Sequence, residues 1–357
     1  MAHPDVRTDA LIVGAGPVGL YMAFQLGLLE IKAHIIDALP YPGGQPETLY
    51  PDKPIYDLPG LPCISGRELT AALMQQITPM QVPMHLGDEV SGIEVLEDSS
   101  GRSFKVSTRQ GRTLHTRSIF VAAGVGAFQA RALKVADAAG VDIAQLEGSQ
   151  LFYHLHQSPK PEGQVLVVGG EDDALKAAIA ATSSAKRVTV LHRRDVFKAE
   201  PEVLEKFHAL RQAGAIKVVA GQPLLYSVDE ASGRLTQIDV LTPEGQTVTL
   251  DVDVLLVFLG LSPKLGPVAE WNLAMSRKQV EVNTETFATS VPGIFAVGDI
   301  NTYPGKKKLL VSGFHECALA AFGAAAYLRP DTPTLLQYTT TSSKLHQILG
   351  VAHPNKI

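Results

Sequence analysis

The sequence predicts an α/β protein that is built twice on the same plan. A buried strand that runs into a glycine-rich turn and then a helix occurs near the N-terminus and again from about Gln164. Each of these βαβ units is followed by short alternating runs that favour antiparallel strands. One further apolar strand then ends each half of the plan. This order is typical of the parallel sheets of doubly wound α/β proteins.

The first unit opens with three elements in βαβ order. These are the apolar strand Ala10–Val13, the helix Pro17–Leu28 and the strand Ala33–Asp37. Ser65 with Glu68 three residues later forms a capping box, which predicts a helix over Gly66–Ile77. The glycine-broken runs of Val82–Thr116 predict antiparallel strands, and Ser118–Ala122 predicts the closing strand.

The second unit repeats this plan, and the C-terminal segment has no βαβ unit of its own. The expected elements are strand Val165–Val168, helix Asp172–Ser183, strands Arg187–Leu191, Val254–Leu259 and Ile294–Val297, and helix Gly313–Leu328. We therefore expect residues 1–123 and 286–357 to form one discontinuous domain around a second domain of residues 124–285. The segment after Pro330 is polar and predicts a tail or a small cap.

The first glycine turn has the spacing of a dinucleotide-binding fingerprint. Gly14 permits a tight turn, Gly16 lets the backbone approach a pyrophosphate, and Gly19 allows close packing of helix and strand. Pro17 opens the helix, whose N-terminal N–H groups attract phosphate. Asp37 ends the next strand, where a carboxylate accepts hydrogen bonds from a ribose. The sequence thus predicts a Rossmann-like nucleotide site.

The C-terminal segment indicates that the first nucleotide is FAD rather than NAD. The strand ending Phe295-Ala-Val runs into Gly298 and Asp299, which presents a carboxylate where a ribityl chain would pass. The following helix would direct its N-terminus at the flavin and favour the reduced, anionic ring. The alternative is a simple turn at the end of a strand.

The second glycine turn departs from the fingerprint at its middle position. Gly169 and Ala174 keep the first and last positions, with Gly170 after the first, but Glu171 replaces the middle glycine and Asp172 follows it. A carboxylate here repels a phosphate by about 1 kcal/mol in water and about 4 kcal/mol near a protein surface. We expect this replacement to weaken nucleotide binding.

Three basic or polar residues at the end of the next strand favour NADP over NAD. His192, Arg193 and Arg194 stand where an acidic residue would select NAD, and arginines there accept a 2′-phosphate. Hydrogen bonds to charged groups contribute about 1.5–3 kcal/mol each. We therefore expect the arginines to outweigh Glu171; the alternative is a basic strand end in solvent.

The composition narrows the class of protein. A net charge of −5 argues against nucleic acid as a partner. Cys63 and Cys317 form neither a C-x-x-C pair nor a zinc pattern, which suits a reducing compartment. Glycines and a proline interrupt the apolar stretch Leu11–Leu29, and the N-terminus has no signal-peptide character. We expect a cytoplasmic protein without a membrane span.

Several motifs in this order resemble the thioredoxin-reductase-like ferredoxin–NADP(+) reductases. The matching pieces are the turn Gly14–Gly19, Gly43-Gly44-Gln45, Thr48-Leu-Tyr50-Pro, Val121-Ala-Ala123-Gly, the His192-Arg-Arg-Asp run, Phe295–Asp299, Gly305–Leu309 and Tyr338-Thr-Thr340-Thr-Ser. Disulfide-reducing relatives carry C-x-x-C before the second glycine turn. This chain has no cysteine there, which excludes a dithiol relay.

The resemblance implies an FAD/NAD(P)-linked reductase fold, with two three-layer ββα domains and a homodimer. It also implies that the FAD domain holds both termini and that the domain between them binds NADP(H). By position, the residues it assigns to FAD are Gly14, Gly16, Pro17, Gly19, Asp37, Gly44, Gln45, Tyr50, Val90, Ala123, Phe128, Gly298, Asp299, Tyr338 and Thr340. Tyr50 and Tyr338 would lie on opposite faces of the flavin ring, although each could instead be a packed tyrosine.

The resemblance implies that FAD passes electrons between NADP(H) and ferredoxin or a flavodoxin-like carrier, and that the flavin carries the chemistry without a catalytic side chain. Because ferredoxins are acidic, Lys306-Lys307-Lys308 is a candidate docking patch; the alternative is a solvated loop. Two other functions stay open. One is an NADPH-dependent reductase of flavin, quinone or oxygen. The other is a non-catalytic, FAD-binding regulatory protein.

Overall fold

The computed structural model describes residues 5–98, 101–137, 142–153 and 161–351. The chain forms two compact units, one of Met1–Ala127 with Pro263–Ile357 and one of Phe128–Ser262. The second crossing lies earlier in the chain than residue 285, where the sequence predicts it. The reason is packing: Trp271 and Val280 are buried against strands of the first unit.

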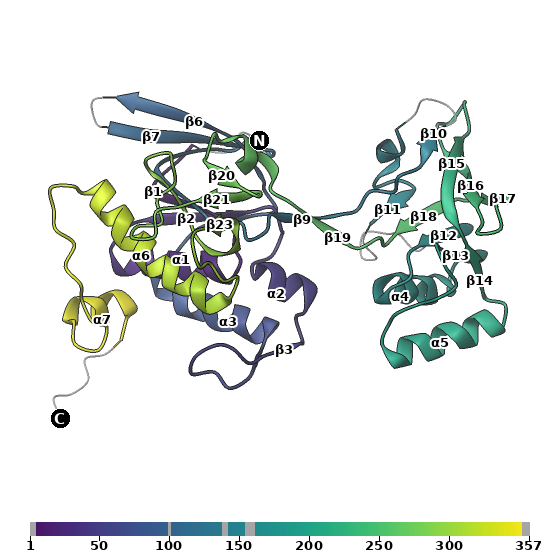
Figure 1. Cartoon of the computed structure of the whole chain (residues 1–357), viewed down its shortest axis with the longest axis horizontal. Helices are drawn as coiled ribbons and strands as arrows, with labels where there is room; N and C mark the ends of the chain where they lie inside the picture. The colour runs from purple at the N-terminus through teal and green to yellow at the C-terminus, as the bar shows by residue number, and fades with distance from the viewer. Residues whose placement is uncertain (1–4, 99–100, 138–141, 154–160, 352–357) are drawn as a thin grey trace. The chain divides into compact units, whose positions relative to one another are not determined.

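A mixed sheet forms the centre of the first unit (Figure 1). Its strands are β5 (Met84–Leu86), β2 (Ala33–Asp37), β1 (Val6–Val13), β8 (Thr113–Val121), β7 (Gly101–Thr108) and β6 (Val90–Asp98) in this order, with β22 (Ile294–Ala296) against β8. Strands β5, β2, β1, β8 and β22 run parallel, whereas β7 and β6 continue from β8 as antiparallel hairpins. The carboxyl ends of β1, β2, β8 and β22 therefore meet at one edge of the sheet.

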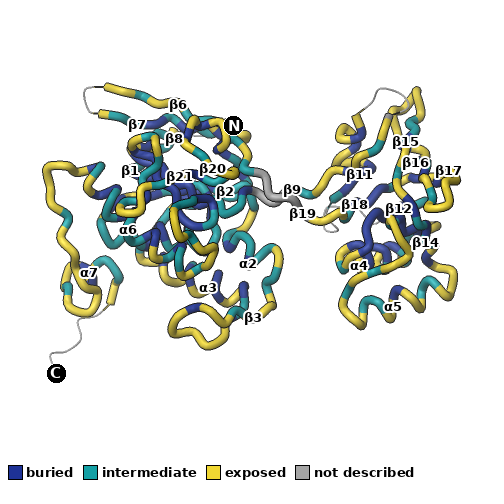
Figure 2. The backbone as a smooth tube through the Cα atoms, viewed as in Figure 1, coloured by how far each residue is buried: buried dark blue, intermediate teal, exposed yellow. Residues whose placement is uncertain are grey.

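Helices cover one face of this sheet. These are α1 (Pro17–Leu28), α3 (Gly66–Ile77) and α6 (Leu310–Leu328), with the short α2 (Gly44–Leu49) beside them. The Ser65–Glu68 capping box begins α3, as the sequence predicts. Apolar residues of the helices and of the sheet form one core, in which Phe120 and Phe295 stack at 5.0 Å. Figure 2 shows that buried residues concentrate along the central strands.

The second unit repeats the parallel sheet with its own core. Its strand order is β11 (Leu151–Phe152), β18 (Val254–Val257), β12 (Gln164–Val168), β13 (Arg187–His192) and β14 (Ile216–Ala220). Helices α4 (Asp172–Ala181) and α5 (Pro201–Gln212) pack together on one face. A second sheet, β10 (Ala136–Asp137), β15 (Gln222–Val228), β16 (Leu235–Leu241) and β17 (Thr247–Asp251), contributes to the core on the other face.

One local prediction is wrong, and one is given its detail by the fold. Met84–Leu86, expected among the antiparallel runs, is the parallel edge strand β5, because its backbone pairs with the edge of β2. The C-terminal segment, expected as a tail or a small cap, includes the helix α7 (Ser343–Leu349), which packs against α1 and pairs Lys344 with Glu30. Both elements depend on contacts with distant residues, which local patterns do not encode.

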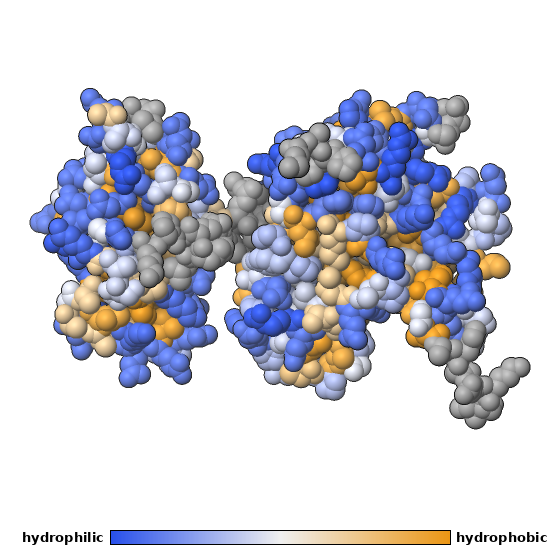
Figure 3. Space-filling view, turned by 180° about the vertical axis from the view of Figure 1, so that it is seen from behind, coloured by the Kyte–Doolittle hydropathy of each residue, from blue (hydrophilic) through white to orange (hydrophobic). Residues whose placement is uncertain are grey.

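Hydrophobic and charged side chains alternate over the face of the molecule in Figure 3. Within the described residues, no helix combines the length and the apolar character that a membrane crossing requires.

Candidate nucleotide-binding sites

The glycine turn between β1 and α1 makes room for a ligand at its middle position. A Cβ atom on Gly14 would lie 2.4 Å from the Ala122 carbonyl oxygen, and one on Gly19 would lie 1.9 Å from the Gly14 oxygen. These two glycines therefore serve packing within the protein. A Cβ on Gly16 would meet only the Gly44 Cα, at 3.9 Å. Gly16 therefore leaves open space in front of α1, whose N-terminus has no side-chain cap.

Asp37 lies beside this turn, as the sequence predicts. Its carboxylate accepts hydrogen bonds from the Ala15 N–H at 2.6 Å and from the Leu39 N–H at 2.8 Å. Burial raises the pKa of Asp37, and these two hydrogen bonds partly oppose that effect. The carboxylate is thus held next to the phosphate-binding turn, with acceptor capacity left for a ribose hydroxyl.

Helix α2 approaches the same turn and has buried polar atoms without a partner. A Cβ on Gly44 would lie 2.9 Å from the Gly16 Cα, so these two backbones are in close contact. Among the described residues, Glu47 Oε2 and Thr48 Oγ1 are buried and accept or donate no hydrogen bond. An unsatisfied buried polar atom is costly. A polar ligand against α2 would relieve this cost. Thr48 belongs to a motif of the resemblance, whereas Glu47 has no signal in the sequence.

The Gly298–Asp299 turn is packed against the start of α1. A Cβ on Gly298 would lie 3.2 Å from Val18, and one on Gly313 in the first turn of α6 would lie 2.5 Å from Val18. The Gly-Asp turn and the first glycine turn therefore border one region, as the sequence predicts.

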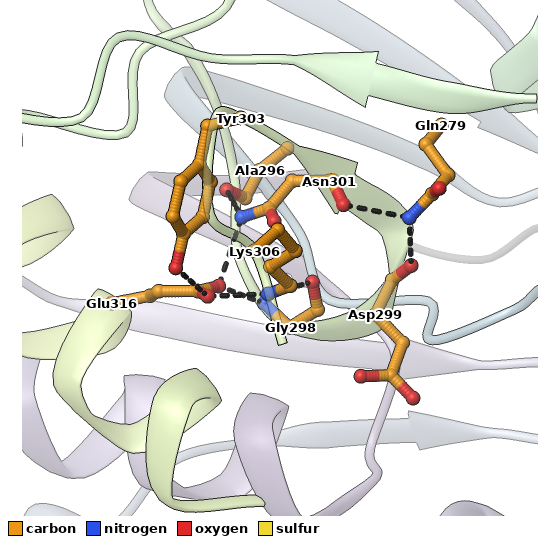
Figure 4. Close-up of polar contacts among 8 residues, drawn as sticks. All are labelled: Gln279, Ala296, Gly298, Asp299, Asn301, Tyr303, Lys306 and Glu316. Atoms are coloured by element: carbon orange, nitrogen blue, oxygen red, sulfur yellow. Dashed lines mark hydrogen bonds and ion pairs between the residues drawn. The ribbon is translucent and has the colours of Figure 1, made fainter. Parts of the chain in front are cut away.

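Asp299 is partly buried, yet no hydrogen bond or ion pair joins its carboxylate to a described residue. In Figure 4 the carboxylate points away from the polar groups around it. Burial raises the pKa of Asp299, and the charges of Lys306 and Lys308 oppose this effect. Asp299 also raises the pKa of Tyr50, after the larger effect of burial, which indicates that the two side chains are near each other. An unpaired, partly buried carboxylate fits a ligand that donates hydroxyl groups.

The other residues predicted to bind FAD lie on several elements of the first unit and beside it in the sequence. The Gln45 amide lies near Gly124, because a Cβ there would be 3.3 Å from Gln45 Nε2. Val90 is a buried core residue on β6, and Ala123 follows β8 and is half-buried. Phe128 is on β9 (Ala127–Ala130), and its side chain is outside the part of the chain that the structure describes.

The structure does not bring Tyr338 and Thr340 of the tail close to the glycine turn of the same chain. Tyr338 is 65% exposed and Thr340 is also exposed. The tail passes to α7, which pairs with Glu30 beyond the C-terminal end of α1, whereas the glycine turn is at the N-terminal end. Figure 1 shows α7 and α2 at opposite sides of the first unit.

The three-lysine run is not a continuous surface patch. Lys306 is buried and forms an ion pair with Glu316 of α6, so the prediction is wrong for this residue. Lys307 and Lys308 are exposed. The chain turns back at Pro304-Gly305, which brings Lys306 inward, whereas a run of like charges by itself predicts solvent on all sides. The Glu316 network in Figure 4 had no signal in the sequence.

The second glycine turn lies at the carboxyl end of β12. A Cβ on Gly169 would be 2.5 Å from the Phe258 carbonyl oxygen and 2.8 Å from the Ala174 side chain, so this position needs glycine for packing. A Cβ on Gly170 would be 2.7 Å from the His192 ring, so Gly170 allows the imidazole to lie against the turn. The predicted residues of the second turn are thus brought together with His192.

Charges of both signs border this turn. Arg193 and Arg194 are exposed and have no ion pair with a described residue, whereas the next acid, Asp195, is paired with Arg211 at 2.6 Å. Burial lowers the pKa of His192, and the two arginines lower it further. The imidazole is therefore neutral at neutral pH, and the two free guanidinium groups supply the positive charge.

The acidic residues of the turn have different surroundings. Glu171 is exposed, and its backbone forms a bridge with Lys198. The Lys198 side chain is exposed. The Asp172 carboxylate accepts from Lys176 Nζ at 2.5 Å and from the Glu200 N–H at 3.2 Å. Lys176 of α4 and the N–H of Glu200, which precedes α5, thus hold the Asp172 carboxylate, and the Lys176 ammonium offsets its charge.

Comparison with known proteins places the chain in one family. Residues 53–298 match the pyridine nucleotide-disulphide oxidoreductase family. A ferredoxin–NADP reductase of Polaromonas naphthalenivorans is 54% identical over 98% of this chain and 94% of its own length. Ferredoxin–NADP reductase 2 of Cupriavidus metallidurans is also 54% identical, over 98% of this chain and 93% of its own.

Solved structures of reductases share the fold. Lactococcus lactis thioredoxin reductase in its FR conformation has a TM-score of 0.55 at 22% identity, covering 90% of this chain and 99% of its own. The bacillithiol disulfide reductase Bdr of Staphylococcus aureus has a TM-score of 0.57 at 16% identity, covering 92% and 100%. The fold, the two nucleotide turns and the sequence similarity together show that the chain belongs to the pyridine nucleotide-disulphide oxidoreductases and, among them, to the ferredoxin–NADP reductases.

Proposed function

We propose that the protein is a ferredoxin–NADP(+) reductase that uses FAD to transfer electrons between NADP(H) and ferredoxin or a similar one-electron carrier. The observation that carries the proposal is the convergence of Gly16, Asp37 and the unpaired Asp299 on one region of the first unit. The relatives at 51–54% identity over nearly the whole chain support the same reaction. We assign FAD to the first unit and NADP(H) to the second.

The residues around the first turn suit the parts of FAD. The α1 N-terminus and Gly16 would hold the pyrophosphate, Asp37 a ribose and Asp299 the ribityl hydroxyls. Tyr50 keeps a neutral phenol, because burial and the charge of Asp299 raise its pKa, so it offers a flat aromatic surface to the flavin. The bound flavin supplies the exchange between hydride and single electrons.

Arg193 and Arg194 would hold the 2′-phosphate of NADP(H). A relay through a dithiol requires two neighbouring cysteines, but Cys63 is exposed and Cys317 is buried in α6, where burial raises its pKa. Electrons therefore leave the flavin without passing through a disulfide.

We further propose a cytoplasmic homodimer. Leu335, Leu336 and Tyr338 in the tail are 75%, 63% and 65% exposed, and such a run of apolar side chains suits contact with a second copy. The cytoplasm suits two unpaired cysteines. Sedimentation velocity on the holoenzyme checks the oligomeric state; a monomer at micromolar concentration would remove the dimer from this proposal.

A comparison of electron acceptors tests the reaction itself. Under anaerobic conditions, turnover with NADPH should be much faster with reducible ferredoxin than with free flavin or a quinone, each at the same concentration. Equal or faster turnover with free flavin, quinone or oxygen would instead identify a general NADPH-dependent reductase.

A further inference from the structure

A buried ion pair joins Glu316 of α6 to Lys306, which lies before the helix and close to the Gly298–Asp299 turn. The Lys306 and Glu316 side chains are 6% and 0% exposed, and the Lys306 ammonium contacts Glu316 Oε1. Burial of two charges is unfavourable unless further hydrogen bonds satisfy them. The partners of this pair therefore indicate what it stabilises.

Among the described residues, every side chain or backbone group that donates a hydrogen bond to the Glu316 carboxylate belongs to one short segment (Figure 4). Its Oε2 accepts from the Gly298 N–H at 2.7 Å and from Asn301 Nδ2 at 2.8 Å. Its Oε1 accepts from the Tyr303 hydroxyl at 3.0 Å, in addition to Lys306. One carboxylate on α6 thus organises the whole of residues 298–306.

The Lys306–Glu316 pair also forms hydrogen bonds with both the N–H and the carbonyl group of Gly298. Glu316 accepts the Gly298 N–H, while Lys306 Nζ donates to the Gly298 carbonyl oxygen at 2.8 Å. Gln279 Nε2 holds the following carbonyl, that of Asp299, at 3.2 Å. The backbone before and after the Gly298 Cα is therefore fixed, while the Asp299 side chain stays free and points away from the network in Figure 4.

We infer that Lys306 and Glu316 are positioning residues, which clamp Gly298 and so set the direction in which Asp299 meets the bound flavin. This inference rests on the proposed function, because it requires FAD in the first unit. A purely structural pair would tolerate replacement by neutral side chains of similar size. A clamp would not, because the Gly298 carbonyl would lose its donor and the turn would gain freedom.

The test compares three variants of the full-length protein. Lys306→Met removes the ammonium, and Lys306→Met/Glu316→Gln removes both charges at similar volume. Lys307→Met is the matched control, since Lys307 is the exposed neighbour with the same charge. For each variant the FAD dissociation constant, the absorption spectrum and midpoint potential of the bound flavin, and the thermal unfolding midpoint are measured.

We expect Lys306→Met to weaken FAD binding by about tenfold or more, the factor that corresponds to one lost charge-assisted hydrogen bond. The double variant should recover most of the unfolding midpoint, but neither the FAD affinity nor the spectrum and potential of the wild-type flavin. The Lys307→Met variant should match the wild type in every measurement. If Lys306→Met does not fold, the double variant decides alone.

Two results would overturn the clamp. One is wild-type FAD affinity and potential in Lys306→Met; the other is recovery of stability and flavin properties together in the double variant, which would make the pair a structural core. The readouts need neither NADPH nor ferredoxin, so failure of the proposed reaction leaves this test intact. If the wild-type chain binds no FAD, the proposed function and the clamp both fall.

Discussion

Arg193 and Arg194 are the residues that we propose set the choice of nicotinamide cofactor. Both are exposed and free of ion pairs with described residues. Replacing either by alanine should weaken NADPH binding by about 10–100-fold, the equivalent of one or two hydrogen bonds to a charged group. NADH binding should stay within a factor of two. Dissociation constants measured by titration check this.

Arg187→Ala is the matched control, because Arg187 is exposed at the opposite end of the same strand, β13. An equal loss of NADPH affinity in this control would attribute the effect to net charge. An equal loss of NADH affinity in the Arg193 or Arg194 variants would contradict a 2′-phosphate site.

Glu171 should act in the opposite direction. Its exposed carboxylate stands at the N-terminus of α4, where a phosphate would bind. We expect Glu171→Gln to tighten NADPH binding by about fivefold, since one repulsion of this kind costs about 1 kcal/mol in a solvated site. The effect should shrink with added salt. Glu205→Gln on α5 is the control, and an unchanged constant in Glu171→Gln would show that the carboxylate avoids the nucleotide.

Asp299 links the flavin site to stability at different pH values. Burial raises its pKa, so ionisation is less favourable in the folded protein than in the unfolded chain. Its contribution to stability is therefore full below the ordinary aspartate pKa and is lost as the pH rises through the raised value. Asp299→Asn cannot ionise, and the FAD-free variant should be more stable than the wild type at pH 7.

This advantage should disappear below about pH 4, near the ordinary aspartate pKa, while FAD binding at pH 7 should weaken. Urea denaturation of the FAD-free proteins at several pH values measures the first trend, and FAD titration at pH 7 measures the second. Asp331→Asn, at an exposed site, should show neither. A wild type that is as stable as Asp299→Asn at pH 7 would mean that the carboxylate has a partner in the protein.

At the scale of elements, the two glycines Gly16 and Gly19 of the β1–α1 turn have different roles, one in ligand binding and the other in packing. Gly16→Ala should cost at most about 1 kcal/mol of stability, because its Cβ meets no atom closer than 3.9 Å and only the N-cap becomes poorer. It should nevertheless weaken FAD binding by about tenfold, because the Cβ would stand where the pyrophosphate approaches.

Gly19→Ala should instead cost about 3 kcal/mol, since its Cβ would lie 1.9 Å from a backbone oxygen. Denaturation curves and FAD titrations of the two variants make the comparison. Wild-type FAD affinity in Gly16→Ala would place the phosphate elsewhere.

The elements also show what the sequence could predict. The glycine turns, the capping box at Ser65 and the βαβ order are encoded within a few residues, so they were predicted at nearly the right bounds. The pairing of Lys306 with Glu316, the parallel edge strand β5 and the docking of α7 depend on residues that only the fold brings together. Local patterns therefore predicted an exposed lysine where the structure has a buried one.

At the scale of the whole molecule, the chain joins two similar units for two nucleotides and lacks the dithiol of disulfide reductases. We propose that the first unit holds FAD and that the second passes electrons to it from NADPH. For this transfer the two free arginines must outweigh Glu171 at the second turn.

An anaerobic absorbance titration of the purified holoprotein with NADPH, repeated with NADH, tests this claim most directly. We predict that near-stoichiometric NADPH bleaches the flavin bands, and that NADH requires a concentration at least about tenfold higher, the factor for one lost hydrogen bond to a charged group. A protein that carries FAD but is bleached by neither nucleotide would contradict the account and favour a non-catalytic, FAD-binding role.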